Sequence, residues 1–360
     1  MSQNKRQMFN QIILNHMLKY PKSEALDILK LIYQNEFGCG HLVKDEMQCL
    51  QMLMNEFNLV SEAETKGALF EHIGNGYSRI SLLDAKKDQI SAELIARLFY
   101  LSAKRQDGNI ESFLKKVGEL KELFRQNELQ FYVSEIEDFV NEWRKHGCKP
   151  FSHSNTYRKN YRPCYRVIQS KYEDFFMLMN DIISRIKCKN IVVAIDGKCG
   201  SGKTTLAAEL KEVFDCNVIR IDDFFLPMHL RTSERLKEPG SNIHYERFLD
   251  EVVSGLKGGK NPIEYGVFDC STMSLAQTEK IYSNPITIIE GVYSLHPNFA
   301  DIYDIKVFCD ADAKLQKARI ITRNGSEMYK KFESVWIPME EKYFETFDVK
   351  AGCNYIYNFK

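Results

Sequence analysis

The chain has 360 residues, of which 44% are hydrophobic and 27% are charged. These values fall in the range of soluble proteins, and the length is enough for two ordinary domains. Lys plus Arg and Asp plus Glu both number 49, so the net charge gives no sign of an anionic partner and any electrostatic argument must be local.

Hydropathy and cysteine spacing exclude two further classes of protein. No apolar run approaches the roughly 18 residues of a membrane-spanning helix. The ten cysteines form neither a CxxC pair nor a zinc-finger spacing, which excludes the usual zinc modules. We therefore expect a cytoplasmic protein with reduced, mostly buried thiols and no membrane partner.

The first half carries apolar residues at helical spacing, which predicts a mostly α-helical domain over residues 1–185. Glycine turns at 37–41 and 73–77 interrupt the helical runs. Such turns can form binding loops, but plain connections between helices are commoner, so we infer no function for this domain. Helices are expected near residues 44–58, 91–105, 110–126 and 131–145.

A basic segment at 143–172 ends this domain. It contains no Asp or Glu but eight Lys or Arg residues, and it repeats Tyr-Arg every four residues at 157–158, 161–162 and 165–166. Pro163 argues against one continuous helix that presents all three pairs. Three interpretations stay open: a structural linker that packs on the second domain, a site for a small anionic ligand, and a surface that grips single-stranded nucleic acid by charge and stacking.

Residues 186–360 show a different pattern. Short β-rich runs at 191–195, 217–221, 285–290 and 304–309 alternate with helical or long connecting segments. Strand and helix in alternation predict an α/β domain with a parallel sheet that is covered by helices on both faces.

The segment GKCGSGKTT follows the first of these strands and satisfies the pattern GxxxxGK[ST]. Its glycines let backbone N–H groups turn toward a phosphate, and the following helix adds the positive end of its dipole. Lys203 is expected to reach the outer phosphates and Thr204 to bind Mg²⁺. Cys199 is either an acidified, oxidisable thiol or, more commonly, a tolerated small residue. The expected nucleotide-binding residues are Gly197, Cys199, Gly200, Ser201, Gly202, Lys203, Thr204 and Thr205.

Carboxylates follow two of the other strands. Asp222 and Asp223 come after the run at 217–221, at the edge of the sheet where open α/β sheets bind ligands. A carboxylate at this edge can accept the proton of an attacking hydroxyl and help to position Mg²⁺. Glu290 ends the run at 285–290 and suits the metal or its water shell. The alternative is that these acidic residues only end strands and have no functional role.

Two arginines lie on a helical run after the strand at 304–309. Arg319 and Arg323 are four residues apart and therefore share one helix face. Arginines on a mobile helix can close over a transferring phosphoryl group and stabilise its charge, although a solvated basic face is the commoner case.

The segments GKCGSGKTT, IDDFFLP, IIEGVYSLHP and QKARIITRNG together resemble the uridine kinase and phosphoribulokinase group of P-loop kinases. The resemblance covers roughly residues 188–360 and implies a P-loop NTPase-type fold that uses ATP and Mg²⁺. It implies that Asp222 is the catalytic base, that Glu290 and Thr204 serve the metal with Asp222, and that Arg319 and Arg323 are lid arginines. Trp336, in the closing helical segment FESVWIPMEEKYFETF, is expected to pack.

The acceptor side departs from the uridine kinase pattern. GVFDCSTM has Met273 where uridine kinases show a histidine that helps to recognise the base, so the resemblance does not carry uracil recognition over. The segment PGSNIHYERF is expected to form part of the acceptor pocket. The residues expected to contact the acceptor are Asp223, His244, Tyr245, Arg247, Phe268 and Asp269.

These features predict an ATP-dependent kinase that transfers the γ-phosphoryl group to a hydroxyl of a nucleoside or ribose-like metabolite. Lys203, Asp222, Arg319 and Arg323 are its expected catalytic residues. Two alternatives remain: an ATP-binding regulator without an acceptor, and a nucleic-acid-associated ATPase that works through the basic segment. The sequence does not identify the acceptor or the oligomeric state.

Overall fold

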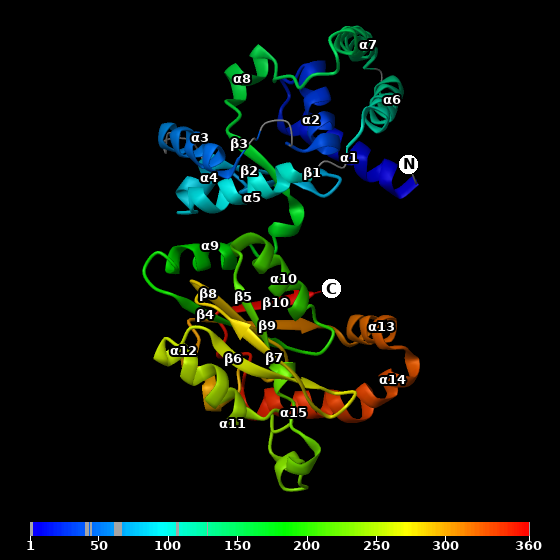
Figure 1. Cartoon of the computed structure of the whole chain (residues 1–360). Helices are drawn as coiled ribbons and strands as arrows, with labels where there is room; N and C mark the ends of the chain where they lie inside the picture. Colours follow the sequence, from blue (N-terminus) through cyan, green and yellow to red (C-terminus); the bar gives the residue numbers. More distant parts are fainter. Residues whose placement is uncertain are drawn as a thin grey trace. The chain divides into compact units, whose positions relative to one another are not determined.

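The computed structural model describes residues 3–39, 43, 45–60, 67–105, 108–127 and 129–359. Contacts between Cα atoms divide the chain into two compact units, Met1–Asn180 (unit 1) and Asp181–Lys360 (unit 2) (Figure 1). The division falls within helix α9 (Phe176–Arg185), five residues before the domain boundary expected from the sequence.

Unit 1 is mostly helical but also contains a three-stranded antiparallel sheet, in the order β1-β2-β3. Each helix buries an apolar stripe, as α5 does with Leu94, Ile95, Leu98 and Phe99. The helices of unit 1 are α1 (Gln3–Lys19), α2 (Ala25–Phe37), α3 (Glu46–Leu59), α4 (Leu82–Lys87), α5 (Ala92–Lys104), α6 (Ile110–Gln126), α7 (Gln130–Lys145), α8 (Asn155–Tyr161) and the first part of α9, and its strands are β1 (Phe70–Gly74), β2 (Tyr77–Ser81) and β3 (Tyr165–Gln169).

The glycine turn at 73–77 does not connect two helices, so that prediction was wrong. It is the tip of the β1–β2 hairpin, in which Gly74 pairs with Tyr77 and only Asn75 and Gly76 form the loop. Both loop residues have positive φ, at 54° and 78°. Asn-Gly is the residue pair that a two-residue hairpin turn of this kind favours, because both positions need that conformation. Residues 40 and 41 of the other glycine turn lie outside the described residues.

The basic segment does not present its tyrosines on the surface. Helix α8 ends at Arg162, where φ is +42°, and β3 begins at Tyr165. The ring of Tyr157 is buried and stacks on His153 with ring centroids 4.2 Å apart. Tyr161 packs edge to face on Tyr20, at 5.0 Å between centroids. The expected row of stacking platforms is therefore folded into unit 1.

Unit 2 is built on a five-stranded sheet with the order β10-β9-β4-β8-β5, and all four pairings are parallel. The expected strands form, and β10 adds an edge strand that the sequence pattern did not predict. Helix α10 packs against β4, β5 and β8. The strands of the sheet are β4 (Ile191–Gly197), β5 (Asn217–Arg220), β8 (Ile286–Glu290), β9 (Ile305–Ala311) and β10 (Tyr355–Phe359).

A separate two-stranded antiparallel ribbon, β6-β7, and several short helices complete unit 2 (Figure 1). The core joins the sheet to the helices through aromatic residues such as Phe248, Phe299, Phe308 and Tyr343. No helix among the described residues is long and apolar enough to cross a membrane. The remaining elements are α10 (Lys203–Phe214), α11 (Tyr245–Phe248), α12 (Ser254–Gly258), β6 (Ile263–Asp269), β7 (Ser274–Ile281), α13 (Ala313–Asn324), α14 (Ser326–Lys331) and α15 (Ile337–Phe347).

Candidate active site

The segment between β4 and α10 is a tight loop that depends on its glycines. Gly197 has φ of +132°, and a Cβ atom there would lie 2.0 Å from the carbonyl oxygen of Cys309 on β9. Gly200 and Gly202 also have positive φ, at 70° and 102°. A side chain at these positions would strain the backbone or collide with the neighbouring strand, so the loop forms only with glycine.

Polar groups inside this loop are arranged to receive an anion. The Lys203 Nζ donates to the carbonyl oxygens of Gly197 and Lys198, at 2.8 and 2.9 Å. The Ser201 hydroxyl is buried and has no hydrogen-bond partner. A buried polar group without a partner costs free energy, so this hydroxyl is an unused hydrogen-bonding group inside the loop. The residues present therefore fit the phosphates of a nucleotide.

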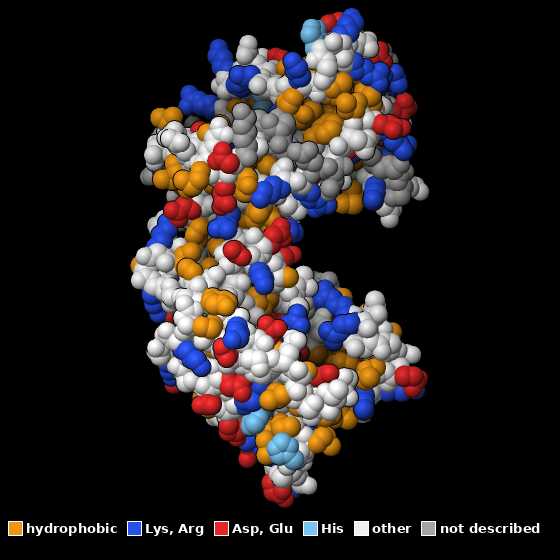
Figure 2. All heavy atoms as spheres, viewed as in Figure 1, with side chains coloured by type: hydrophobic (Ala, Val, Ile, Leu, Met, Phe, Trp, Pro, Cys, Tyr) orange, Lys and Arg blue, Asp and Glu red, His pale blue; other side chains and the backbone are white. Residues whose placement is uncertain are grey.

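A cavity of about 940 Å³ opens beside the loop. In the space-filling view, unit 2 is hollowed beside α13 and α14, where basic and hydrophobic side chains border the hollow (Figure 2). This volume is within the range of small-molecule sites. The loop lines the cavity with six of the eight expected residues, Cys199, Gly200, Gly202, Lys203, Thr204 and Thr205, whereas Gly197 and Ser201 lie outside the lining.

The expected metal residues meet on one side of this cavity. Glu290 is buried at the end of β8, and the Thr204 hydroxyl donates to its two carboxylate oxygens at 3.2 and 3.3 Å. Burial and the nearby carboxylate of Asp222 raise the pKa of Glu290. No three His, Cys, Asp or Glu side chains gather closely enough to hold a metal ion in the described part of the chain. Mg²⁺ would therefore need phosphate oxygens and water in addition to Thr204 and Glu290.

Asp222 follows β5 and lines the same cavity. Its side chain is accessible from the cavity, but surrounding protein removes much of its bulk hydration and raises its pKa, while the charges of Lys203 and Arg323 act to lower it. Gly291 has φ of +137°, and a Cβ atom there would lie 2.4 Å from Ile221. Only glycine lets the end of β8 come this close to the residue before Asp222. Asp222 and Glu290 therefore face one space.

Helix α13 packs on the phosphate loop and brings both expected arginines to the cavity wall. Arg319 donates to the carbonyl oxygen of Gly200 at 3.1 Å, and Gln316 donates to the carbonyl oxygen of Cys199 at 3.1 Å. Arg323 is exposed, and among the described residues its side chain bonds only to its neighbour Asn324, at 2.8 Å. Arg319 is therefore fixed to the loop, whereas Arg323 has freedom to move.

Cys199 is not an acidified thiol. Burial, followed by the nearby Glu340 carboxyl, raises the pKa of Cys199 to about 12. A thiol with that pKa is protonated at neutral pH and is a poor nucleophile. Of the two interpretations drawn from the sequence, the structure supports a tolerated small residue.

Glu340 is a site residue that the sequence did not indicate. It is buried on α15 and lines the cavity, and its carboxylate accepts the Cys199 backbone N–H at 2.9 Å. Burial raises the pKa of Glu340 to about 7, against the charge of Lys203. No local pattern in the sequence connects residue 340 to a loop 141 positions earlier.

We expect nucleotide binding to take up protons near pH 7 through Glu340. Below a pKa of about 7 its carboxyl is neutral, and above it the carboxylate repels phosphate. Affinity is therefore expected to fall as the pH rises through 7, by up to about tenfold. Proton uptake can be measured by calorimetric titration with ATP in buffers of different ionisation enthalpy. Glu340→Gln keeps an acceptor for Cys199, so its affinity should vary less with pH; equal proton uptake by both proteins would contradict this assignment.

Asp196 is a second residue that the sequence analysis missed. It is buried at the end of β4, and its carboxylate accepts the backbone N–H groups of Gly197, Tyr293 and Leu295 at 2.7, 3.1 and 2.9 Å and the Tyr343 hydroxyl at 2.8 Å. It therefore ties the phosphate loop to the segment after β8 and to α15. The signal in the sequence that could have indicated Asp196 is an acidic residue near the end of an apolar strand.

None of the residues expected to contact the acceptor lines the cavity. Arg247 is held by the carbonyl oxygens of Asp223 and Gly266, both at 2.5 Å. Tyr245 stacks on His296, with centroids 5.3 Å apart, and the His244 side chain lies 4.0 Å from Glu246. Phe268 is buried, and Asp269 accepts the backbone N–H of Ser271 at 2.7 Å within the β6–β7 turn.

The expected acceptor segments still reach the cavity, but through other residues. Asn242 stands two positions before His244, and Cys270 and Met273 follow Asp269. A short antiparallel bridge joins the backbone at 224–226 to that at 242–244 and brings these two segments together. Phe225, Met228, Arg231 and Trp336 complete this wall.

Comparison with known proteins agrees with this geometry. The model of the Phosphoribulokinase / Uridine kinase family matches residues 192–343. A uridine kinase from Clostridium perfringens (strain ATCC 13124) is 31% identical in an alignment of 155 residues that covers 40% of this chain and 73% of that protein. The chain belongs to the phosphoribulokinase/uridine kinase family.

Within this family, a uridine kinase from Chlamydia pneumoniae is 29% identical in an alignment of 174 residues that covers 43% of this chain and 76% of that protein. A solved structure described as a possible uridine kinase from Bacillus stearothermophilus is 19% identical, with a TM-score of 0.42, over 52% of this chain and 100% of that chain. The family match lies within unit 2, which is a P-loop kinase domain.

Proposed function

We propose that this protein transfers the γ-phosphoryl group of ATP to a hydroxyl of a small metabolite of the nucleoside or ribose-like class, with Mg²⁺, and that residues 186–360 form the kinase domain. The observation that carries the proposal is that one cavity is lined by Asp222, Lys203, Thr204 and Glu290. A phosphate loop alone is shared by switches and motors, but a carboxylate that faces the same space supplies the base that transfer to an alcohol needs.

Each side chain has a role in this proposal. Lys203 and the loop N–H groups hold the phosphates, and Thr204 with Glu290 holds Mg²⁺ with the assistance of Asp222. The metal, when bound, neutralises phosphate charge and orients the γ-phosphoryl group.

Asp222 takes the proton of the acceptor hydroxyl while the hydroxyl oxygen forms a bond to the γ-phosphorus. The bond from that phosphorus to the bridging oxygen breaks, and ADP leaves with the electron pair. The raised pKa of Asp222 suits this role, because a base with a pKa nearer to the working pH accepts a proton more readily. Arg319 and Arg323 stabilise the charge on the moving group from α13.

The acceptor side combines apolar and polar groups. Phe225, Met228 and Met273 offer apolar contact, and Arg231 and Asn242 offer hydrogen-bond donors. A flat base or ring with a polyhydroxylated part fits such a wall. The similar proteins named uridine kinase support the nucleoside class. Asn242 and Met273 line this wall in place of the acceptor residues expected from the sequence. Experiment must therefore decide which nucleoside is phosphorylated.

The test is ADP release by the full chain with ATP and Mg²⁺ in the presence of separate nucleosides, pentoses and vitamins. We expect ADP release to require one acceptor class, to yield a phosphorylated product by mass spectrometry, and to stop when the metal is chelated. ADP release that is the same with and without every acceptor would overturn the proposal. Stimulation by RNA or DNA with a steep salt dependence would favour the nucleic-acid-associated ATPase instead.

A further inference from the structure

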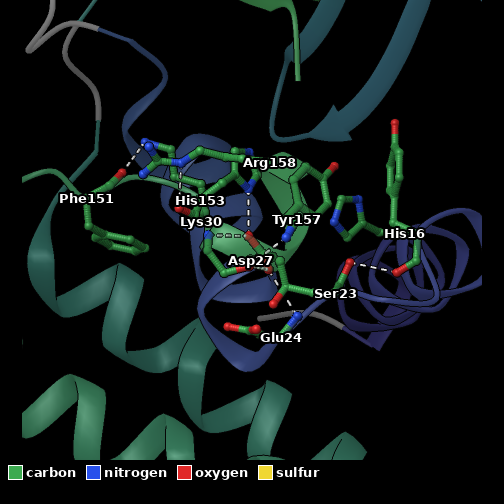
Figure 3. A network of polar contacts seen from close by, with 12 residues as sticks. His16, Ser23, Glu24, Asp27, Lys30, Phe151, His153, Tyr157 and Arg158 are labelled. Carbon is green, nitrogen blue, oxygen red and sulfur yellow. Dashed lines mark hydrogen bonds and ion pairs between the residues drawn. The ribbon is translucent and has the colours of Figure 1, made fainter. Parts of the chain in front are cut away.

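Unit 1 contains a buried polar network between α2 and the basic segment. The Asp27 carboxylate accepts the His153 ring Nδ1–H at 2.9 Å and the Ser154 hydroxyl at 2.7 Å (Figure 3). Although burial acts to raise it, the hydrogen bonds from His153 and Ser154 hold the pKa of Asp27 below its usual range. Burial lowers the pKa of His153, so its ring is neutral and its other nitrogen is an acceptor.

That nitrogen fixes the Tyr165 side chain. The His153 Nε2 lies 2.6 Å from the Tyr165 hydroxyl, and the Gln34 amide nitrogen donates to the same hydroxyl at 3.2 Å. Burial raises the pKa of Tyr165, so it remains a neutral phenol and is not an activated nucleophile. The network therefore holds the Tyr165 side chain in one position and does not form a catalytic triad.

Gln34 is held in one orientation by a buried arginine. The guanidinium of Arg79 donates to the Gln34 amide oxygen at 2.9 and 2.7 Å, and it lies 4.6 Å from the centre of the Tyr165 ring. Because both arginine bonds engage the oxygen, the Gln34 NH₂ group must point away from Arg79. In the described part of the chain, this NH₂ group donates to Tyr165 alone, which leaves its second N–H as a donor.

A cavity of about 420 Å³ lies against these side chains. Helix α2 contributes Lys30 and Gln34 to its lining, β3 contributes Tyr165 and Arg166, and Met52 and Phe99 add an apolar side. The volume is in the range of small-molecule sites. The lining therefore combines hydrogen-bond donors with an apolar side, and it also includes the Glu56 carboxylate, which pairs with Arg166.

Lys30 is the unusual charge in this lining. It is largely buried, it donates to the Phe151 carbonyl oxygen at 2.6 Å, and it lies within 6 Å of the Tyr33 and Phe151 rings (Figure 3). No carboxylate pairs with it in the described chain, whereas Arg166 pairs with Glu56 at 2.6 Å. Burial, helped by the charge of Arg79, lowers the pKa of Lys30 to about 8. A buried cation without a counter-charge is costly, and it marks candidate ligand sites.

We propose that this cavity binds a small organic anion, with Lys30 as its counter-charge and Gln34 and Arg166 as further donors to the anionic oxygens. The apolar side formed by Met52 and Phe99 fits a flat ring attached to the anionic group. The site lies within unit 1 and is independent of the kinase chemistry of unit 2. The proposed site also gives the basic segment a role, because two residues of that segment, Tyr165 and Arg166, line the cavity.

Pyridoxal 5′-phosphate, a flat phosphate-bearing aldehyde, is the probe for this site. Its aldehyde carbon condenses with a free lysine amine and releases water, and borohydride then reduces the imine so that labelled peptides can be mapped in the full chain. Near pH 8 we expect Lys30 to be labelled roughly tenfold or more faster than the exposed Lys115, with saturation at increasing probe concentration. Lys116 is a second comparison, because it is buried and pairs with Glu36 at 2.6 Å.

Competition separates a binding site from a merely reactive amine. Phenyl phosphate and benzoate distinguish phosphate from carboxylate ligands, and protection of Lys30 by either, but not by neutral benzyl alcohol, supports the proposal. Lys30→Met should leave the chain folded, because it replaces an unpaired buried cation with an apolar side chain of similar length, and it should abolish the thermal shift caused by the protecting anion. Unsaturable labelling without protection by any anion, or an unchanged thermal shift in Lys30→Met, would overturn the proposal.

Discussion

Asp222→Asn is expected to lower turnover about 10²- to 10⁴-fold, which is the usual contribution of a positioned general base. The amide has the same shape as the carboxylate but cannot accept the proton of the acceptor hydroxyl. In the proposed arrangement the loop between β4 and α10 holds the phosphates, and Thr204 and Glu290 remain to hold the metal. The dissociation constant for ATP should therefore change by less than about threefold. Steady-state ADP release and an equilibrium ATP titration measure the two effects separately.

The neighbouring Asp223→Asn provides the matched comparison. Asp223 adjoins Asp222 in sequence, but it is absent from the cavity lining and its main chain is held by Arg247. We expect its turnover to stay within about tenfold of the unaltered protein, a loss well below that of a missing base. In the unaltered protein, turnover should also fall as the pH drops through the raised pKa of Asp222, because the base must be ionised. Full activity of Asp222→Asn would mean that another group takes the proton.

Asp196→Ala is expected to destabilise unit 2 by on the order of 3–5 kcal/mol. It removes the acceptor of three backbone N–H groups and the Tyr343 hydroxyl, and each buried donor left without a partner costs about 1–3 kcal/mol before relaxation. Urea unfolding can be followed by the fluorescence of Trp336 in a Trp143→Phe background, since the chain has only these two tryptophans. The signal then reports unit 2 alone.

Asp310→Ala is the control for this measurement. Asp310 lies near the end of the adjacent strand β9 and pairs with Lys198 at 3.0 Å and Lys350 at 2.7 Å, nearer to solvent. Partly exposed ion pairs contribute little, so the loss should be about 1 kcal/mol or less. If the two variants lost equal stability, the hydrogen bonds to Asp196 would be worth no more than surface pairs.

The parts of the site that follow from local geometry could be predicted from the sequence. The phosphate loop is nine consecutive residues, and its glycines are dictated by backbone conformation and by contact with one neighbouring strand. Glu290 ends β8 and Asp222 lies two residues past the end of β5, and these strands are parallel, so their side chains had to meet at the same edge of the sheet. Both positions line the cavity as that argument requires.

Contacts over long sequence separations could not be predicted in this way. Glu340 reaches Cys199 because α15 packs on the loop, and no spacing rule encodes that approach. The acceptor wall was predicted a few residues away from its place: Asn242, Cys270 and Met273 line the cavity, and no spacing rule selects them over their neighbours His244 and Asp269. In unit 1, the helical spacing of apolar residues predicted helices on both sides of residues 73–77. The pair Asn75-Gly76 is the local signal for the β-hairpin that forms there.

The hydrogen bonds to Asp196 also determine when, during synthesis, the phosphate loop can reach its native conformation. Its carboxylate belongs to the first strand of unit 2, but its partners Tyr293, Leu295 and Tyr343 are made about 100 to 150 residues later. A nascent chain that ends before residue 293 therefore carries the whole nucleotide-binding motif without the bonds from Tyr293, Leu295 and Tyr343, and one that ends before α15 still lacks the bond from Tyr343. Because domains generally fold as units, competence to bind nucleotide should arise only after nearly all of unit 2 has left the ribosome.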